Sequence, residues 1–326
     1  MKPFADPLGP PTRLADMRAG SGALRTLAGR TASAARRPER PTHLPERPAR
    51  RALIGAGLAT ALAQGWLARR AHAAAPESRL ALVIGNADYK VGPLKNPVND
   101  ARLVGDNLRS LGFEVIQREN ASLRDMLESM RQFISRGKDS QVRLLYYAGH
   151  GFQVKGRNYL LPIDSDIRAE DDVPSKSADV AELLDRLGQL KTGINIVILD
   201  ACRNNPFTGG EVLGPDGRRL KFRGTAASGL APLEAPLGTM VAFSTAPGGV
   251  ALDSPDDRNS LYTKHLVSNL KTPGLPIEML FKQVRLSVAR ETSRLQVPWE
   301  SSSLTGDFCF RPGPTGGCAV VRAATN

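Results

Sequence analysis

Short apolar runs alternate with amphipathic segments along this chain from residue 79 onward. The apolar runs have the length and composition of strands buried on both faces of a sheet, and they cover residues 80–85, 113–116, 144–148, 194–199 and 239–244. The segments between and after them predict helices over residues 99–111, 122–135, 178–190, 260–270 and 276–292. Repeated strand–helix–strand order predicts an α/β fold, with a mostly parallel β-sheet flanked by helices on both faces and ligands bound at the carboxyl ends of the strands.

The alternation fails over residues 207–238, where Gly, Pro and Ala dominate. This composition predicts an exposed, mobile loop. Order resumes at residue 239, and residues 296–310 close the body. We therefore expect one domain over residues 76–311, divided by the loop into a larger part at 79–206 and a smaller part at 239–311, with a flexible tail at 312–326.

The first 75 residues differ in composition from this body. Residues 1–49 are rich in Pro, Arg and Ala and predict a disordered basic leader. Residues 50–75 combine paired arginines, a short apolar run and a small-residue cleavage site, the order of a twin-arginine secretory signal. We expect export, to the bacterial periplasm or out of the cell, with no stable membrane span after signal removal; the protein is cytoplasmic if the leader is not functional. A membrane anchor or an amphipathic helix is the alternative, although the run is short for a transmembrane helix.

The leader also explains most of the formal net charge of +12. Residues 1–75 contain 13 Lys and Arg against 4 Asp and Glu, so the remaining residues carry a net charge of only +3. No basic patch interleaved with aromatic residues stands out in the body. The sequence therefore argues against nucleic acid as a partner.

Two predicted strands lead into residues that can perform nucleophilic catalysis. One leads into His150, which lies between two glycines, and the other leads into Cys202, 52 residues later. A cysteine attacks as a thiolate and therefore requires a neighbouring base. His43 and His72 lie in the leader and His265 lies in a predicted helix, so His150 is the best candidate for that base.

Each residue alone has a simpler explanation. A histidine can end a strand for structural reasons, and a free cysteine is often buried as a small hydrophobic residue. Their joint placement at matching strand ends, with no better base in the body, favours a Cys–His catalytic dyad.

Characteristic strings extend beyond the dyad. They are LVIGN at 82–86, LKNPVNDA at 94–101, YAGHG at 147–151, DACRN at 200–204 and FSTAPG at 243–248. Through these strings the chain resembles the caspase-like cysteine peptidases, nearest the bacterial metacaspase-like (orthocaspase) branch, in which a histidine about 50 residues before the cysteine is the expected spacing. The resemblance implies a caspase-like sheet, with large-subunit-like and small-subunit-like parts on either side of the loop. It also implies that the backbone N–H groups of Gly151 and Cys202 bind the oxyanion and that Ser244 borders the substrate groove.

The residue two positions before the cysteine departs from animal caspases, whose motif begins with Gln and whose pocket uses cationic residues to bind Asp. Here that residue is Asp200. In metacaspase-like relatives this Asp and the Asp of an Asn-Asp-Ala motif, here Asp100, line the pocket for the residue before the scissile bond. Two carboxylates favour Arg or Lys through charge-assisted hydrogen bonds and repel Asp. The alternative for Asp100 is a helix N-cap.

These inferences predict a cysteine endopeptidase that hydrolyses polypeptides after Arg or Lys through a thioester acyl-enzyme. The alternative is a catalytically silent caspase-like module that binds peptides or partners in the cell envelope. The loop carries four candidates for self-cleavage by such an enzyme: Arg218, Arg219, Lys221 and Arg223. A solvated charged loop is the alternative for this cluster.

The chemistry requires no cofactor. Calcium activates some metacaspase relatives, but Asp253, Asp256 and Asp257 form only a weak acidic cluster, so the sequence leaves the metal open. Cys309 and Cys318 either pair across the Pro- and Gly-rich tail or stay unpaired.

Overall fold

The computed structural model describes residues 77–190, 192–202, 212–213, 219–220, 230–247, 251 and 258–318. An 8-stranded sheet forms the centre, with the strand order β10-β9-β6-β3-β1-β2 along its main path. These strands are β1 (Arg79–Gly85), β2 (Phe113–Glu119), β3 (Val142–Val154), β6 (Ile194–Cys202), β9 (Thr239–Phe243) and β10 (Trp299–Ser302). Along this path only β10 runs antiparallel to its neighbour, which confirms the predicted mostly parallel α/β fold.

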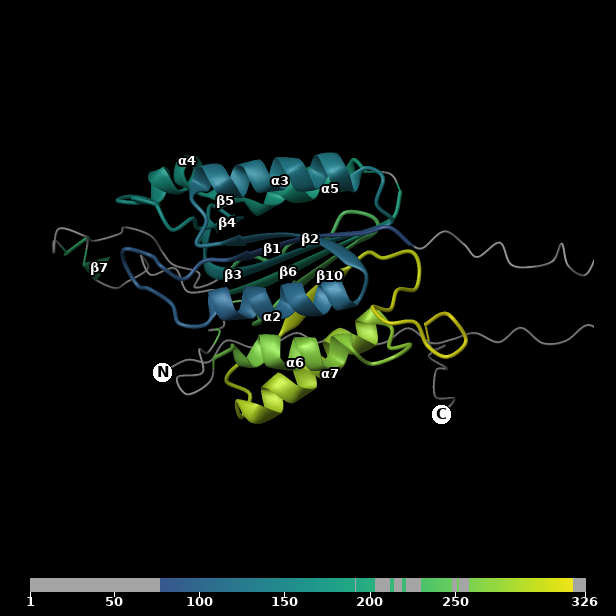
Figure 1. Cartoon of the computed structure of the whole chain (residues 1–326). Helices are drawn as coiled ribbons and strands as arrows, with labels where there is room; N and C mark the ends of the chain where they lie inside the picture. The colour runs from purple at the N-terminus through teal and green to yellow at the C-terminus, as the bar shows by residue number, and fades with distance from the viewer. Residues whose placement is uncertain are drawn as a thin grey trace, which may run out of the picture. The chain divides into compact units, whose positions relative to one another are not determined.

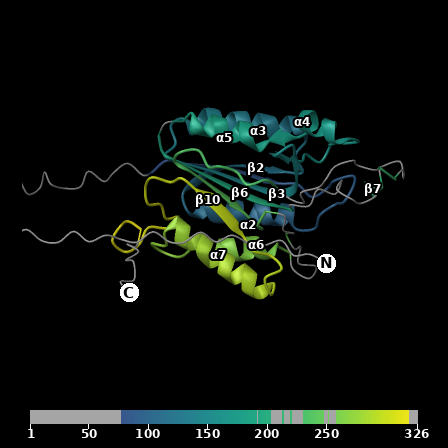
Figure 2. The same cartoon turned by 180° about the vertical axis from the view of Figure 1, so that it is seen from behind.

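Helices cover both faces of this sheet, as Figures 1 and 2 show from opposite sides. One face carries α3 (Leu123–Gly137), α4 (Val173–Lys176) and α5 (Val180–Gly188). The other face carries α2 (Pro97–Ser110), α6 (Leu261–Leu270) and α7 (Ile277–Glu291). A short 3-10 helix, η1 (Glu170–Asp172), precedes α4.

The pleat of the strands divides the core between these two faces. On β3, Leu144 and Tyr146 belong to the cluster that includes α2, α6 and α7, whereas Leu145 and Tyr147 belong to the cluster that includes α3 and α5. Side chains alternate between the faces of a strand, so a run that is apolar throughout is needed where both faces are covered. This is why the parallel strands could be located from sequence.

Local helix signals were accurate at α3 and less so elsewhere. Ser122 and Asp125 form the predicted capping box at the start of α3. α2 begins at Pro97 rather than at residue 99, because proline suits the first turn of a helix. The helix expected over 178–190 is shorter, since Asp179 caps α5 by accepting a hydrogen bond from the Ala181 N–H at 2.8 Å.

Two strands next to the site were missed. β3 does not end at Ala148 but continues to Val154, and a hairpin returns the chain as β4 (Arg157–Leu160). Lys155 and Gly156 both have positive φ at its turn, the geometry of a two-residue hairpin that follows the twist of the strands. β5 (Ala178–Asp179) pairs in turn with β4.

The expectation of an exposed loop over 207–238 was wrong at its carboxyl end. Leu230 and Ala231 are buried, and the Asn158 side chain bonds both the N–H and the carbonyl of Ala231, at 2.6 and 3.0 Å. Within the earlier part, β7 (Val212–Leu213) pairs antiparallel with β8 (Arg219–Leu220), and the remaining residues up to 229 lie outside the described residues.

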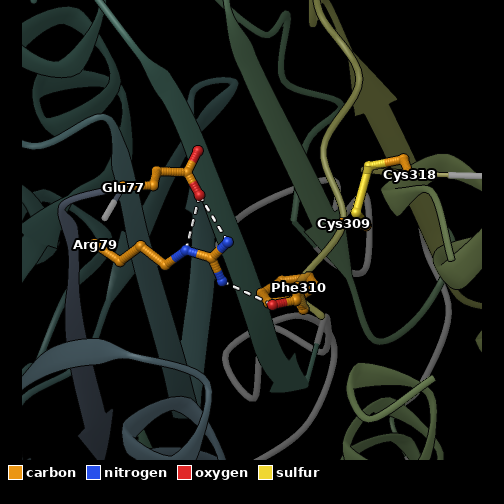
Figure 3. Close-up of a disulfide and its surroundings, with 5 residues drawn as sticks. All are labelled: Glu77, Arg79, Cys309, Phe310 and Cys318. Carbon is orange, nitrogen blue, oxygen red and sulfur yellow. Dashed lines mark hydrogen bonds and ion pairs between the residues drawn. A yellow bond between two sulfur atoms is a disulfide. The ribbon is translucent and has the colours of Figure 1, made fainter. Parts of the chain in front are cut away.

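A disulfide joins Cys309 to Cys318, with Cα atoms 5.5 Å apart, which decides the pairing that the sequence left open (Figure 3). Beside it, Arg79 donates to the carbonyls of Phe310 and Leu111 at 2.7 and 3.2 Å and pairs with Glu77. The described part of the tail is therefore attached near the amino-terminal end of β1. The predicted dyad lies toward the carboxyl ends of the parallel strands.

The leader at 1–49 and the signal segment at 50–75 lie outside the described residues. Across the described part of the chain, no helix is both long enough and apolar enough to cross a membrane.

Candidate active site

Strands β3 and β6 bring His150 and Cys202 together. They pair in parallel from Val142 with Ile194 to His150 with Cys202, which is the last residue of β6. Partners on adjacent strands have backbones on the order of 5 Å apart. Neither sequence position alone predicts this register; it follows from the way the two strands align within the sheet.

The backbone just before His150 has a conformation that favours glycine. Gly149 has φ of +152°, and a Cβ there would lie 2.5 Å from Tyr89 Oη and 2.7 Å from Tyr147 Oη. Both hydroxyls hold the chain at this point: Tyr89 Oη accepts from the His150 N–H at 3.0 Å, and Tyr147 Oη donates to the His150 carbonyl at 2.7 Å. Glycine therefore lets two buried tyrosines fix the backbone of the candidate base.

The imidazole of His150 has a defined tautomer. Its Nε2 lies 2.7 Å from the carbonyl oxygen of Gly92, and its ring lies 4.4 Å from the Tyr89 ring between centroids. A carbonyl can only accept a hydrogen bond, so Nε2 carries the proton. In the neutral ring, Nδ1 is then the nitrogen with a lone pair, as a general base requires.

Asp100 and Asp200 also come together, on the face of the sheet covered by α2 and α6. Asp100 is 1% exposed and Asp200 is 9% exposed. Burial and the neighbouring charge of Asp200 raise the pKa of Asp100 from 3.8 to about 8, although hydrogen bonds from Asn259 and Ser260 oppose the shift. Asn96, not Asp100, occupies the N-cap position of α2, so the alternative role for Asp100 is wrong.

Three hydroxyl groups surround one oxygen of Asp200. Its Oδ2 accepts from Ser260 Oγ at 2.7 Å and lies 3.1 Å from Thr263 Oγ1 and 3.4 Å from Tyr146 Oη. The last two hydroxyls also bond each other at 2.6 Å, so one of them donates to the other and only one donates to Asp200. Burial and the charges of Asp200 and Asp100 raise the pKa of Tyr146 well above its ordinary value, so this phenol stays protonated. The donors stabilise the ionised form of Asp200, which makes Asp100 the proton-bearing member of the pair.

Ser244 follows β9, the strand next to β6. Its N–H donates to the Leu199 carbonyl at 3.0 Å, and its carbonyl accepts from the Gln296 side chain at 2.8 Å. The hydroxyl is buried and has no hydrogen-bond partner within the described structure. Gly151 follows His150 on β3 and is paired with Leu160 of β4.

Most of the remaining sequence candidates lie outside the described residues. His265 lies on α6, where its Nε2 is 2.7 Å from a carboxylate oxygen of Glu291 on α7. Of the four basic candidates for self-cleavage, only Arg219 is described, in β8. Asp253, Asp256 and Asp257 lie outside the described residues, within which no group of three or more His, Cys, Asp or Glu side chains could hold a metal ion.

A family model for the caspase domain matches residues 78–309. The chain belongs to the caspase-domain family. This assignment includes both strands that carry the candidate dyad, as well as α2 and α6, which surround the acid pair. The match agrees with the mostly parallel sheet of this caspase domain.

Individual relatives agree with this assignment. Over 131 residues the chain is 31% identical to human mucosa-associated lymphoid tissue lymphoma translocation protein 1, an alignment that covers 39% of this chain and 15% of that protein. Over 257 residues it is 27% identical to rat caspase-1, covering 72% of this chain and 60% of that protein. The aligned regions thus span less than two thirds of either relative.

Several residues of the site were not anticipated from the sequence. They are Gly92, which accepts from the imidazole, Tyr89, which holds the His150 backbone, and Ser260, which contacts both acids. Only Ser260 gave a signal, as the first residue of a predicted helix. A carbonyl contact leaves no trace in residue type, so Gly92 could not have been found.

Proposed function

We propose that this caspase-domain protein is a cysteine endopeptidase that cuts polypeptides after Arg or Lys. The observation that carries the proposal is the pairing of His150 with Cys202 at the carboxyl ends of β3 and β6. An imidazole with its proton on Nε2 offers Nδ1 as the base for the neighbouring thiol.

The reaction proceeds in two steps. His150 Nδ1 takes the thiol proton of Cys202, and the thiolate forms a C–S bond with the substrate carbonyl carbon while the N–H groups of Gly151 and Cys202 bind the oxyanion. The C–N bond then breaks as His150 gives its proton to the leaving amine, which leaves a thioester. His150 next deprotonates a water molecule, which displaces the sulfur and releases the carboxylic acid product.

The acid pair supports the preference for basic residues. Asp100 and Asp200 are buried on adjoining elements and interact electrostatically. A guanidinium or ammonium group beside the ionised Asp200 also favours ionisation of Asp100 and gains charge-assisted hydrogen bonds, whereas an Asp side chain brings a second negative charge next to Asp200. Ser244 is proposed to contribute to the same groove, since its buried hydroxyl has no partner in the described structure.

A peptide panel tests the proposal on the full chain. We expect kcat/KM for peptides ending in Arg or Lys to exceed that for the neutral analogue citrulline by about tenfold or more, the value of a hydrogen bond to a charged group. Asp peptides are not cleaved. Preference for Asp over Arg would contradict the proposal.

Two inactivating variants and one control complete this test. Cys202→Ala and His150→Ala remove turnover, while His265→Ala, which alters the other histidine of the body, retains it. An Arg-based electrophilic peptide labels Cys202 in the wild type. Absence of both labelling and turnover would favour the catalytically silent binding module instead.

A further inference from the structure

Ser260 contacts both members of the acid pair. Its backbone N–H donates to Asp100 Oδ1 at 2.9 Å, and its hydroxyl donates to Asp200 Oδ2 at 2.7 Å. Ser260 is itself 6% exposed. The two carboxylates come from elements far apart in the sequence, α2 and β6, and this residue bridges them at the start of α6.

The Ser260 hydroxyl takes part in two hydrogen bonds, as an acceptor in one and as a donor in the other. The Ser260 hydroxyl accepts from the Thr263 N–H at 3.1 Å, as a helix N-cap does, so its only hydrogen is committed to Asp200. The same residue therefore caps α6 and stabilises a buried negative charge.

The turn before α6 is attached to Asp100 at further points. Asn259 Nδ2 donates to Asp100 Oδ1 at 2.8 Å, and the Arg258 carbonyl accepts from Asn99 Nδ2 at 3.1 Å. The Asn259 amide and the Ser260 N–H thus both donate to Oδ1 of Asp100.

We propose that Ser260 is a positioning residue for specificity, which holds Asp100 and Asp200 at the separation that accepts one basic side chain. The inference rests on the proposed preference for Arg or Lys. Without the bridge, the paired acids are free to rotate apart or to stay protonated, and either change weakens the recognition of a cation more than that of a neutral side chain.

Replacement of the serine separates this role from helix capping. In Ser260→Ala we expect KM for the Arg peptide to rise about tenfold with a smaller change in kcat, and KM for the citrulline peptide to stay as in the wild type. Loss of a donor raises the pKa of the acid pair, so the acidic limb of kcat/KM for Arg moves to higher pH. Ser260→Thr keeps the hydroxyl, so we expect its KM for the Arg peptide and its acidic limb to stay as in the wild type.

Ser122→Ala is the matched control, because Ser122 caps α3 and is remote in the fold from the acid pair. It loses a similar capping contribution and leaves the Arg-to-citrulline ratio and the pH limb unchanged. Ser260→Gly serves where Ser260→Ala does not fold, since glycine is tolerated at N-caps at a cost of only a few tenths of a kcal/mol. It should reproduce the selective loss.

The outcomes distinguish the two proposals. If the wild type does not prefer Arg to citrulline, the proposed function fails at the start. If the wild type prefers Arg but Ser260→Ala and Ser260→Gly keep the same ratio and the same pH limb, the function stands and the role of Ser260 is wrong. Equal losses on both peptides would also overturn it, as they would show a structural role only.

Discussion

At the scale of single residues, the acid pair has the most unusual chemistry. Asp100 is buried beside Asp200, and its pKa is raised to about 8, mainly by loss of solvation. Between about pH 4 and pH 8 the folded protein therefore keeps a proton that the unfolded chain releases. The free energy of unfolding of the protein decreases as the pH rises through this window. The total decrease is at most about 1.4 kcal/mol for each unit by which folding raises the pKa of Asp100.

Asp100→Asn removes this dependence. We expect the free energy of unfolding of the variant, relative to the wild type, to increase from pH 5 to pH 8, because Asn keeps the Oδ1 acceptor and never ionises. Urea denaturation at several pH values measures it. Asp106→Asn on the same helix is the control, since its side chain is 76% exposed and its curve should run parallel to that of the wild type. If the free energy of unfolding of Asp100→Asn ran parallel to that of the wild type over this pH range, the raised pKa of Asp100 would be contradicted.

At the scale of elements, β3 pairs with different strands along its length. It pairs with β6 up to His150 and then turns into the hairpin with β4. Gly149 marks the change, because only a residue without Cβ fits between Tyr89 and Tyr147. The position of the candidate base thus depends on the packing around a glycine.

Gly149→Ala tests this dependence. The added Cβ collides with two buried hydroxyls, so we expect a loss of stability of about 1–3 kcal/mol and a large fall in kcat/KM as His150 is displaced. Gly156→Ala is the control: Gly156 has φ of +79° and a Cβ there meets nothing within 4 Å. The control shares the backbone strain and keeps the activity. Equal activity in the two variants would show that Gly149 does not position His150.

At the scale of the whole molecule, the disulfide and the leader bear on where the protein works. The Cys309–Cys318 bond suits an oxidising compartment and supports the proposed export, with removal of the segment at 50–75. The basic cluster in the 207–238 loop makes self-processing a further proposal, because an enzyme with this specificity can cut beside those residues.

One experiment addresses both proposals. N-terminal sequencing of wild-type and Cys202→Ala protein recovered from the producing cells should find leader cleavage in both, because another enzyme performs it. Cleavage after Arg218, Arg219, Lys221 or Arg223 is expected in the wild type only. Loop cleavage in both proteins would exclude self-processing, and an intact leader in both would exclude export with cleavage.

Local patterns predicted much of the fold. The apolar runs located the parallel strands, and Ser122 with Asp125 located the start of α3, since these signals act within a few residues of chain. The hairpin of β3 and β4 was missed because Lys155-Gly156 is a turn signal only when its flanking strands are known. The burial of Ala231 was missed because its backbone bonds Asn158, which is distant in sequence.

The sequence by itself determined the residue types and their order: a histidine and a cysteine after two buried strands, and two aspartates with a basic substrate as their expected partner. The tertiary structure alone decided that β3 and β6 align His150 with Cys202, that Gly92 sets the imidazole tautomer, and that Ser260 joins the two acids. Strand register, backbone acceptors and shared hydrogen bonds arise between segments far apart in the chain. Their energies depend on distance and burial, which residue order does not contain.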